Sequence, residues 1–378
     1  MDYKYRLQQL RDLMEQKELS TIFVFNPDHQ FYLSGFKAFT YSRPIVLSID
    51  LEQSTLVLPG LEEVHAKDAA TVDNILVYYE HPMDHPVKKD HMEWIEDIIQ
   101  KYPAGATIGV DVTSIPGNII QVLQKRGFNV TDIGEVIERM RYVKDASEIE
   151  WLEKAGELVN LAVSKSIEAI KIGTTEMEID AAGNTALFAE TARKYPNATL
   201  DLNVMSPSGV KRSVMPHMFS NTREIKPGDV IIHTRQVGLN GYRAELERTV
   251  IVGEPTDEQK RAFEVAVEAQ RRTIDFIKPG VKASEVDLKA REIIDQAGLG
   301  QYAIHRIGHG IGLSAHEKPF LRYDNEDLII EEGMVFTIEP GIYIPNVGGF
   351  RHSDTVIITS DGCRLITEYP YEVNDLIL

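Results

Sequence analysis

The stretch EEGMVFTIEPGIYIP, residues 331–345, contains the apolar run MVFTIEPGIY with a single acidic residue, Glu339, in its interior. A run of this kind is consistent with a buried strand. A carboxylate in a buried strand needs a partner, and functional sites are where such groups concentrate. We therefore expect Glu339 to belong to a functional site and not to a water-exposed surface.

Other histidines and carboxylates gather in the segments around this stretch. They are found in VMPHMF (His217), AELERT (Glu245, Glu247), HRIGHGIGLSAHE (His305, His309, His316) and GFRHSDT (His352, Ser353). In a strand, Glu245 and Glu247 lie two residues apart and share one face. Two like charges side by side cost energy unless a cation, a metal or a proton lies between them. The alternative for this pair is a strand face that water covers.

Conventional nucleophile signatures are absent. The chain has no G-x-S-x-G motif, and its one cysteine, Cys363, lies in SDGCRL, which is typical of a hairpin turn. The glycines of GHGIG (308–312) are soon followed by Pro319, so they predict a tight backbone path and not a phosphate cradle.

Local patterns predict two regions of different organisation. The first 135 or so residues alternate helix and strand patterns, with helices over 3–17, 91–102 and 117–127, strands at 21–25 and 106–111, and a hairpin over 44–59. A capping signal at 145–148 begins a long helix to about residue 172, and a second helix covers 176–194. Strands at 230–234 and 242–252, joined by the GLNG turn, come next. Helices over 257–277 and 284–297 then precede another strand-rich stretch. Two helices then strands, repeated once, indicate an internally duplicated α+β domain.

Composition and charge narrow the function class. The 378 residues include 40 Lys and Arg against 58 Asp and Glu, for a formal net charge of −18. Such a surface repels phosphate backbones and anionic lipid, so we expect neither nucleic acid nor membrane as a partner. The start of the chain lacks the apolar segment of a signal peptide, and a single cysteine fits a reducing cytoplasm, which is the predicted location.

Several segments together resemble one known family. NGY…ERTVIVGEPTDEQ, IKPGV, GHGIGLSAHE, EEGMVFTIEPGIYIP and the junction RMRYVKDASEIEWLEKA are similar to the creatinase, prolidase and aminopeptidase P family. The resemblance implies an N-terminal α/β domain of creatinase type over residues 1–140. It implies a pita-bread catalytic domain, α+β with an internal pseudo-twofold, over 141–378. It also implies a homodimer in which the subunits share the site.

The family's peptidases hold two metal ions with five ligands, and the resemblance places these at Thr234, Glu245, His309, Glu339 and Ser353. Thr234 and Ser353 replace carboxylates, and they cannot supply bridging ligands. His233 and His352 neighbour these two positions, but strand alternation directs them to the opposite face.

The same departures resemble creatinase, the metal-free hydrolase of this fold. They imply a metal-independent C–N hydrolase without a cofactor, acting on a small guanidino or amidino carboxylate. In this hypothesis His217 is the general base, Glu247 and Glu339 hold the planar cation, and Arg43 in YSRPIV binds the substrate carboxylate. The remaining substrate-binding residues are Glu245, His305, His309, His316 and Ser353, and either Lys318 or Arg322 replaces a second carboxylate-binding arginine.

Two alternatives stay open. The first is a metallopeptidase of the prolidase or Xaa-Pro aminopeptidase type, with one divalent ion held by Glu245, His309 and Glu339. The second is a binding protein that kept the pocket and lost the chemistry.

Overall fold

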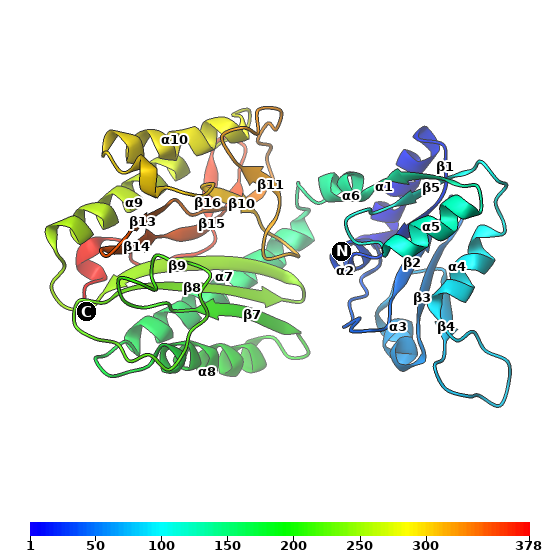
Figure 1. Ribbon diagram of the computed structural model, residues 1–378, viewed down its shortest axis with the longest axis horizontal. Helices are drawn as coiled ribbons and strands as arrows, with labels where there is room; N and C mark the ends of the chain where they lie inside the picture. The colour runs from blue at the N-terminus through cyan, green and yellow to red at the C-terminus, as the bar shows by residue number, and fades with distance from the viewer. The chain divides into compact units, whose positions relative to one another are not determined.

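The computed structural model describes residues 1–378, which form two compact units, Met1–Arg141 and Tyr142–Leu378 (Figure 1). An α/β unit of the expected creatinase type is followed by a pita-bread α+β unit, so the predicted fold class is confirmed. No helix is both long enough and apolar enough to cross a membrane.

The N-terminal unit is a six-stranded sheet with helices packed against it. Its strands run in the order β4-β3-β2-β1-β5-β6, with the β1–β2 and β2–β3 pairs antiparallel and the others parallel. The strands are β1 (Leu19–Val24), β2 (Val46–Ile49), β3 (Ser54–Pro59), β4 (Asn74–Tyr78), β5 (Thr107–Val110) and β6 (Asn129–Asp132). The helices are α1 (Tyr3–Gln16), α2 (Pro27–Ser34), α3 (Glu63–Ala69), α4 (His91–Ile99), α5 (Gly117–Lys125) and α6 (Gly134–Met140), with a 3₁₀ turn η1 (Gly60–Glu62). Every residue of β2 and β3 is buried, as expected of strands covered on both faces.

The C-terminal unit is built on an eight-stranded sheet. Its order is β11-β10-β12-β15-β9-β8-β7, with β16 paired to β15 and a separate ribbon of β13 and β14. The strands are β7 (Leu200–Met205), β8 (Val230–Leu239), β9 (Tyr242–Ile251), β10 (Gly308–Gly310), β11 (Glu317–Leu321), β12 (Val335–Ile338), β13 (Gly341–Ile344), β14 (Gly348–Arg351), β15 (Ser353–Ile358) and β16 (Cys363–Leu365). The helices are α7 (Ala146–Glu168), α8 (Glu176–Lys194), α9 (Asp257–Phe276) and α10 (Ala283–Gln296), with 3₁₀ turns η2 (Gly300–Tyr302) and η3 (Val373–Asp375).

Local chemistry explains where these helices begin. Capping boxes, in which the N-cap side chain and the third helical residue bond each other's backbone, begin α7 at Asp145 and α8 at Thr175. A third capping box begins α9 at Thr256. The capping signal at 145–148 is therefore confirmed, but α7 ends at Glu168 and not near residue 172 as predicted.

The hairpin of β8 and β9 is the longest ladder of the sheet. Asn240 and Gly241 take positive φ values of 49° and 89° at its tip, the backbone that a two-residue hairpin turn requires. The prediction ended the first strand at residue 234, whereas β8 continues to Leu239. Polar residues such as Thr234 and Gln236 interrupt the apolar pattern, and they lie there because they face the site described below.

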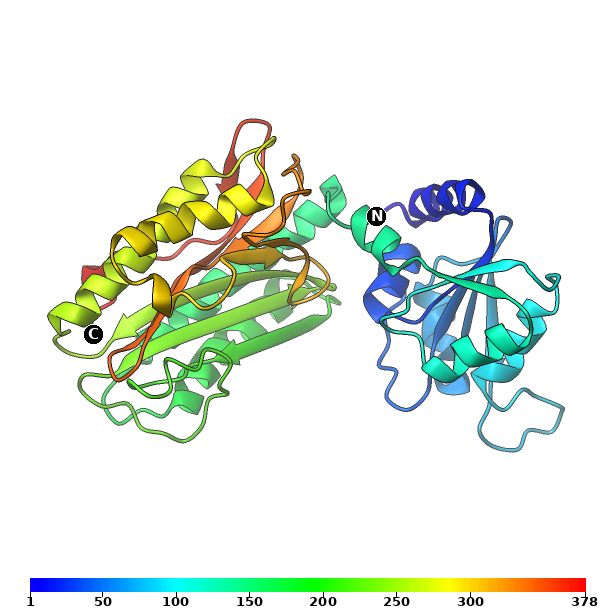
Figure 2. The same cartoon turned by 45° about the horizontal axis from the view of Figure 1, so that its top comes forward.

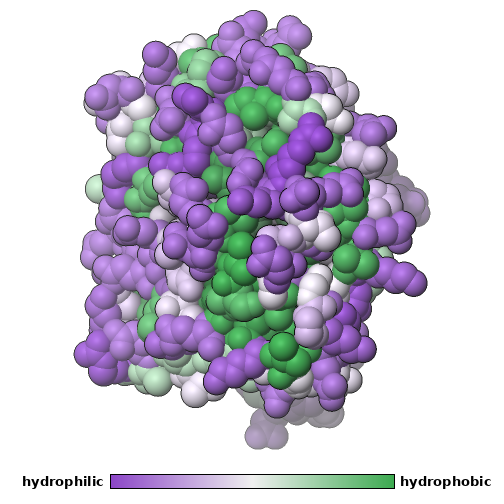
Figure 3. Space-filling model, turned by 90° about the vertical axis from the view of Figure 1, so that its left-hand side faces the viewer, coloured by the Kyte–Doolittle hydropathy of each residue, from purple (hydrophilic) through white to green (hydrophobic).

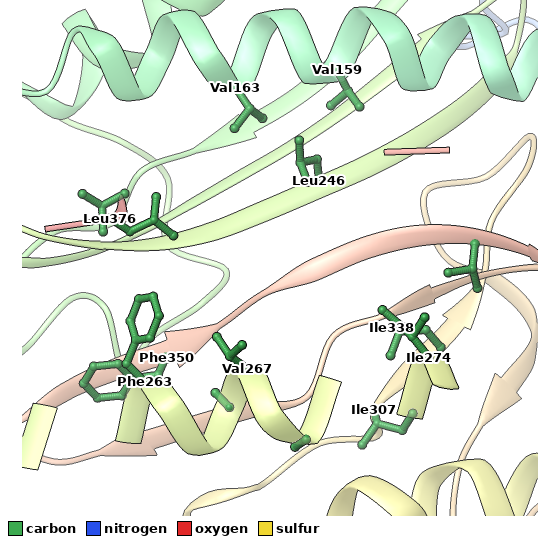
Figure 4. Close-up of a cluster of buried hydrophobic side chains, with 14 of the residues drawn as sticks. Val159, Val163, Leu246, Phe263, Val267, Ile274, Ile307, Ile338, Phe350 and Leu376 are labelled. Carbon is green, nitrogen blue, oxygen red and sulfur yellow. The ribbon is translucent and has the colours of Figure 1, made fainter. Parts of the chain in front are cut away.

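Helix pairs α7–α8 and α9–α10 each precede a group of strands, as the predicted duplication requires (Figures 1 and 2). Val159 and Val163 of α7 point toward Leu246 of β9 in the hydrophobic core (Figure 4). Because successive side chains of a strand point to opposite faces, Glu245 and Glu247 point away from this core. Glu245 and Glu247 therefore lie on the face of the sheet opposite to this core.

Two glycines of GHGIG permit close backbone packing. A Cβ atom on Gly308 would lie 2.1 Å from the carbonyl oxygen of Thr337, and one on Gly310 would lie 2.8 Å from that of Lys318. These residues belong to a short strand, β10, and the structural role predicted for them fits this placement. On the face drawn in Figure 3, a central strip of hydrophobic side chains is bordered by hydrophilic ones.

Candidate active site

A cavity of about 300 Å³ opens on the face of the C-terminal sheet that carries the acidic pair. Its polar lining comes from β8, β9, the residue after β12, the end of β14 and the loops that carry His217 and His316. The lining includes Thr234, Gln236, Glu245, Glu247, Glu339, Arg351, His217 and His316, together with Phe219. The sheet therefore brings residues from both halves of the duplication into one site.

Three carboxylates crowd the floor of this cavity. Glu245, Glu247 and Glu339 are all buried, and each has an oxygen within 4.8 Å of the others. Glu245 accepts hydrogen bonds from Gln236 at 2.5 Å and from Ser353 at 2.7 Å. Burial raises the pKa of Glu245, and the charge of Glu339 raises it further. Such crowding of carboxylates is costly unless a cation or a proton lies between them.

One cation is part of the protein. Arg351 donates from Nε and Nη2 to the two carboxylate oxygens of Glu247, at 2.5 and 2.7 Å. Burial raises the pKa of Glu247, and Glu245 and Glu339 add to the rise, whereas the charge and the hydrogen bonds of Arg351 act against it and favour the carboxylate. Burial disfavours the charge on Arg351, but Glu247 outweighs it and holds the pKa of the guanidinium well above its ordinary value.

His309 presents a buried ring nitrogen to the carboxylates. Its Nδ1 lies 2.9 Å from the carbonyl oxygen of Gly310, which can only accept, so Nδ1 carries the proton. Its Nε2 lies 3.2 Å from Oε1 of Glu339 without the geometry of a hydrogen bond, and it has no other partner. Burial disfavours the imidazolium, but Glu339 outweighs burial and raises the pKa of His309.

These residues fit a divalent metal ion. The buried Nε2 of His309 has no hydrogen-bond partner and faces a carboxylate oxygen of Glu339, and this is an arrangement that a cation would satisfy. Glu245 and His309 also form a second cluster with His316, whose ring stacks on His309 at a centroid distance of 3.7 Å. Glu245 belongs to both clusters, and the 3.2 Å approach of His309 Nε2 to Oε1 of Glu339 joins them, so Glu245, His309 and Glu339 lie close enough to hold one ion together.

The other predicted site residues have different surroundings. His217 is exposed at the cavity, with its ring centroid 6.5 Å from that of His316. His305 does not line the cavity, because its ring nitrogens face the carbonyl oxygen of Arg306 at 2.6 Å and the hydroxyl of Tyr343 at 2.8 Å. Ser353 is fully buried, and its hydroxyl donates a hydrogen bond to Glu245.

Of the three basic residues proposed to bind a substrate carboxylate, Lys318 and Arg322 do not line the cavity, and Arg43 belongs to the other unit. Arg43 belongs to the N-terminal unit, where its Nε lies 2.6 Å from Glu80. Arg322 pairs with Asp324 on the surface, through Nη2 at 2.8 Å. Lys318 is exposed and does not line the cavity.

His233 and His352 point away from the cavity, as strand alternation predicted. His233 lies 2.8 Å from the hydroxyl of Ser206, and His352 packs edge-on against Phe263 of α9. Neither histidine can replace the carboxylates missing at Thr234 and Ser353.

Sequence reasoning missed two residues of the site. Arg351 lies two residues before Ser353 in the quoted GFRHSDT, and Gln236 lies two after Thr234. The spacing of two that put Glu245 and Glu247 on one face could have identified both.

Comparison with known proteins identifies the family to which the chain belongs. The model of metallopeptidase family M24 matches residues 150–360, and the creatinase/prolidase N-terminal domain matches residues 6–143. The chain belongs to the M24 family. It is similar to an M24 protein of Pyrococcus furiosus named Xaa-Pro dipeptidase, at 33% identity over 98% of this chain and 99% of the relative. A second Xaa-Pro dipeptidase, from Lactobacillus helveticus, is 30% identical over 96% of each chain.

Solved prolidase structures have the same architecture. The prolidase of Thermococcus sibiricus superposes with a TM-score of 0.86 at 28% identity, covering 100% of this chain and 99% of that one. The prolidase of Pyrococcus horikoshii gives a TM-score of 0.84 at 29% identity, covering 98% and 99%.

These findings correct the main functional hypothesis. The expectation of a metal-independent, creatinase-like C–N hydrolase was wrong, because the family is one of metallopeptidases and the similar relatives are Xaa-Pro dipeptidases. The expectation of no cofactor was wrong for the same reason, since the family implies divalent metal and the site has candidate ligands. The physical error concerned Glu247, because Arg351 already binds both its oxygens and leaves it unable to grip a cationic substrate.

Proposed function

We propose that this protein is a metal-dependent Xaa-Pro dipeptidase whose divalent ion is held by Glu245, His309 and Glu339. The observation that carries the proposal is the unpartnered, buried Nε2 of His309, which faces Glu339, a residue that lines the cavity together with Glu245. The relatives named Xaa-Pro dipeptidase support a dipeptide with a C-terminal proline as the substrate.

A divalent cation in such a site supplies Lewis acidity, polarising the scissile carbonyl and making water a better nucleophile. The residues around the site would orient the substrate and transfer protons to it. Arg306 donates to Nδ1 of His316 at 3.0 Å, so the neutral ring of His316 carries its proton on Nε2 and can donate it to a substrate oxygen. Burial lowers the pKa of His316 to about 4, which keeps that ring neutral at pH 7.

Hydrolysis also needs a proton for the departing proline nitrogen. His217 is exposed at the cavity and belongs to no strand of the sheet, so it can reach both substrate and solvent. We assign it the proton transfer to the leaving nitrogen, the usual role of a histidine near neutral pH. Ser353 and Gln236 hold Glu245 in place through their hydrogen bonds.

The test compares substrates and metals. Protein treated with chelator and then with Mn²⁺, Co²⁺ or Zn²⁺ should cleave Xaa-Pro dipeptides only after metal is restored. Glu339→Gln should abolish this activity, whereas Glu331→Gln, at an exposed position, should not change it. Full activity of chelated protein, or binding of dipeptide without turnover by metal-loaded protein, would refute the proposal.

Two further expectations remain predictions. The homodimer with a shared site is tested by light scattering of the purified protein. Binding of the substrate carboxylate by Arg43 is tested by Arg43→Gln, which should raise KM for dipeptides and leave kcat nearly unchanged.

A further inference from the structure

Arg351 is fixed in place more firmly than a surface arginine. Its backbone N–H donates to the hydroxyl of Thr249 at 2.9 Å, and that hydroxyl donates to the Arg351 carbonyl at 3.0 Å. Its Nη1 donates to the hydroxyl of Tyr343 at 3.3 Å, and that hydroxyl also faces His305 at 2.8 Å. With Glu247 held through both oxygens, the guanidinium has a single position.

The two hydroxyl side chains of the site, Thr234 and Ser353, also make hydrogen bonds within the site. Thr234 accepts from Nη2 of Arg351 at 3.1 Å, and it lies directly opposite Glu247 in the β8–β9 ladder. Ser353 lies opposite Glu247 in the β9–β15 ladder and donates to Glu245 at 2.7 Å. Both hydroxyls therefore serve the carboxylates and the arginine, and neither adds a negative charge.

The charges of the site are balanced by one divalent ion. The two hydrogen bonds from Arg351 hold Glu247 as a carboxylate, so the three buried carboxylates and one guanidinium leave two net negative charges. One divalent cation neutralises these, whereas a second would leave two uncompensated positive charges in a buried cavity, which is costly.

We propose that the Arg351–Glu247 pair is a built-in cation site, in which the guanidinium does the electrostatic work of a second metal ion and limits the protein to one divalent ion per chain. This inference rests on the proposed function only in assuming that Glu245, His309 and Glu339 bind a divalent cation. It assigns Arg351 a positioning and electrostatic role and does not make it a catalytic residue.

Four proteins test it by metal binding alone. Wild type and the double variant Glu247→Gln/Arg351→Gln both leave two net negative charges around the ion. Arg351→Gln leaves three and Glu247→Gln leaves one. Calorimetric titration of chelated protein with Co²⁺ or Mn²⁺, with elemental analysis of the product, should give one ion per chain for wild type. Arg351→Gln should bind the ion most tightly and Glu247→Gln most weakly. Wild type and the double variant should have similar affinities between these two, and each step should be about tenfold or more.

Two results would overturn the inference. One is wild type binding two ions per chain, and the other is all four proteins binding within about twofold of one another. Should Arg351→Gln not fold, because it leaves a buried carboxylate unpaired, the charge-matched double variant and Glu247→Gln still decide between the outcomes. If the four proteins show the expected order of metal affinities but do not hydrolyse Xaa-Pro dipeptides, the proposed function is refuted and this inference stands.

Discussion

The hydroxyl of Ser353 donates to Oε1 of Glu245 at 2.7 Å, across the neighbouring strands β15 and β9. A hydroxyl at this position gives Glu245 a hydrogen bond where a further carboxylate would add charge. The bond lowers the pKa of Glu245, against the larger raising effect of burial, and so favours the ionised form that binds metal.

Ser353→Ala should therefore weaken divalent-ion binding severalfold without abolishing it. A hydrogen bond to a charged group contributes about 1.5–3 kcal/mol, which sets the upper limit of the loss. Calorimetric titration with Mn²⁺ measures the change, and Ser360→Ala on the exposed turn after β15 is the control. An unchanged affinity would mean that Gln236 alone orients Glu245.

His309 and His217 should separate metal binding from proton transfer. His309→Ala removes a proposed ligand, so it should reduce metal affinity by more than about a hundredfold and eliminate turnover. His217→Ala should keep one metal per chain and lower kcat by about 10²–10⁴-fold, the usual contribution of general acid–base catalysis. A normal kcat in His217→Ala would require another proton donor, whereas loss of metal would show that His217 takes part in metal binding.

His352 should make the protein sensitive to acid. Burial holds the pKa of His352 well below its ordinary value of 6.5, and Arg248 adds to this effect. Below about pH 6.5 His352 binds a proton in the unfolded chain but stays neutral in the folded chain. The free energy of unfolding therefore falls as the pH drops. The loss from this group amounts to at most about 1.4 kcal/mol per pH unit.

His352→Leu tests this dependence. Neither ring nitrogen of His352 has a hydrogen-bond partner within the protein, and an unsatisfied buried polar group costs about 1–3 kcal/mol. Denaturant unfolding at pH 7.5 and pH 5.5 should show the variant more stable than wild type, with the larger gain at pH 5.5. An equal or smaller gain at pH 5.5 would show that His352 does not carry the acid sensitivity.

Cys363 should be unreactive in the native protein. Burial raises the pKa of its thiol to about 11, with Asp275 adding to the rise, and its Sγ lies 3.4 Å from the carbonyl oxygen of Ile274. Because the thiolate is the reactive form, a thiol reagent at pH 7.5 should label the protein only after denaturation. Rapid labelling of native protein would show that the turn before β16 opens readily.

The sequence predicted the elements whose signals are local. The capping box at Asp145 and Glu148 marks the start of α7, and the Asn240–Gly241 turn marks the tip of a hairpin, because each needs only neighbouring residues. The same holds for the shared face of Glu245 and Glu247, which follows from strand periodicity.

Contacts between distant segments could not be predicted in this way. Arg351 is more than a hundred residues from Glu247 in the sequence, and only the fold brings them into contact. Without that contact Glu247 appeared free to bind a cationic substrate, which is the role that the creatinase-like hypothesis gave it. His305 likewise appeared to be a pocket residue, whereas it contacts Tyr343 of β13, which lies 38 residues further along the chain.

The duplicated architecture has a consequence for folding. Glu245 comes from the strands that follow α7 and α8, whereas His309 and Glu339 come from the strands that follow α9 and α10. A cation bound by all three fastens the two repeats together, and neither repeat alone can bind it with the full ligand set. Metal at a hundred times its dissociation constant would then stabilise the native state by about 2.7 kcal/mol. Metal uptake during refolding would report the moment at which the two repeats meet.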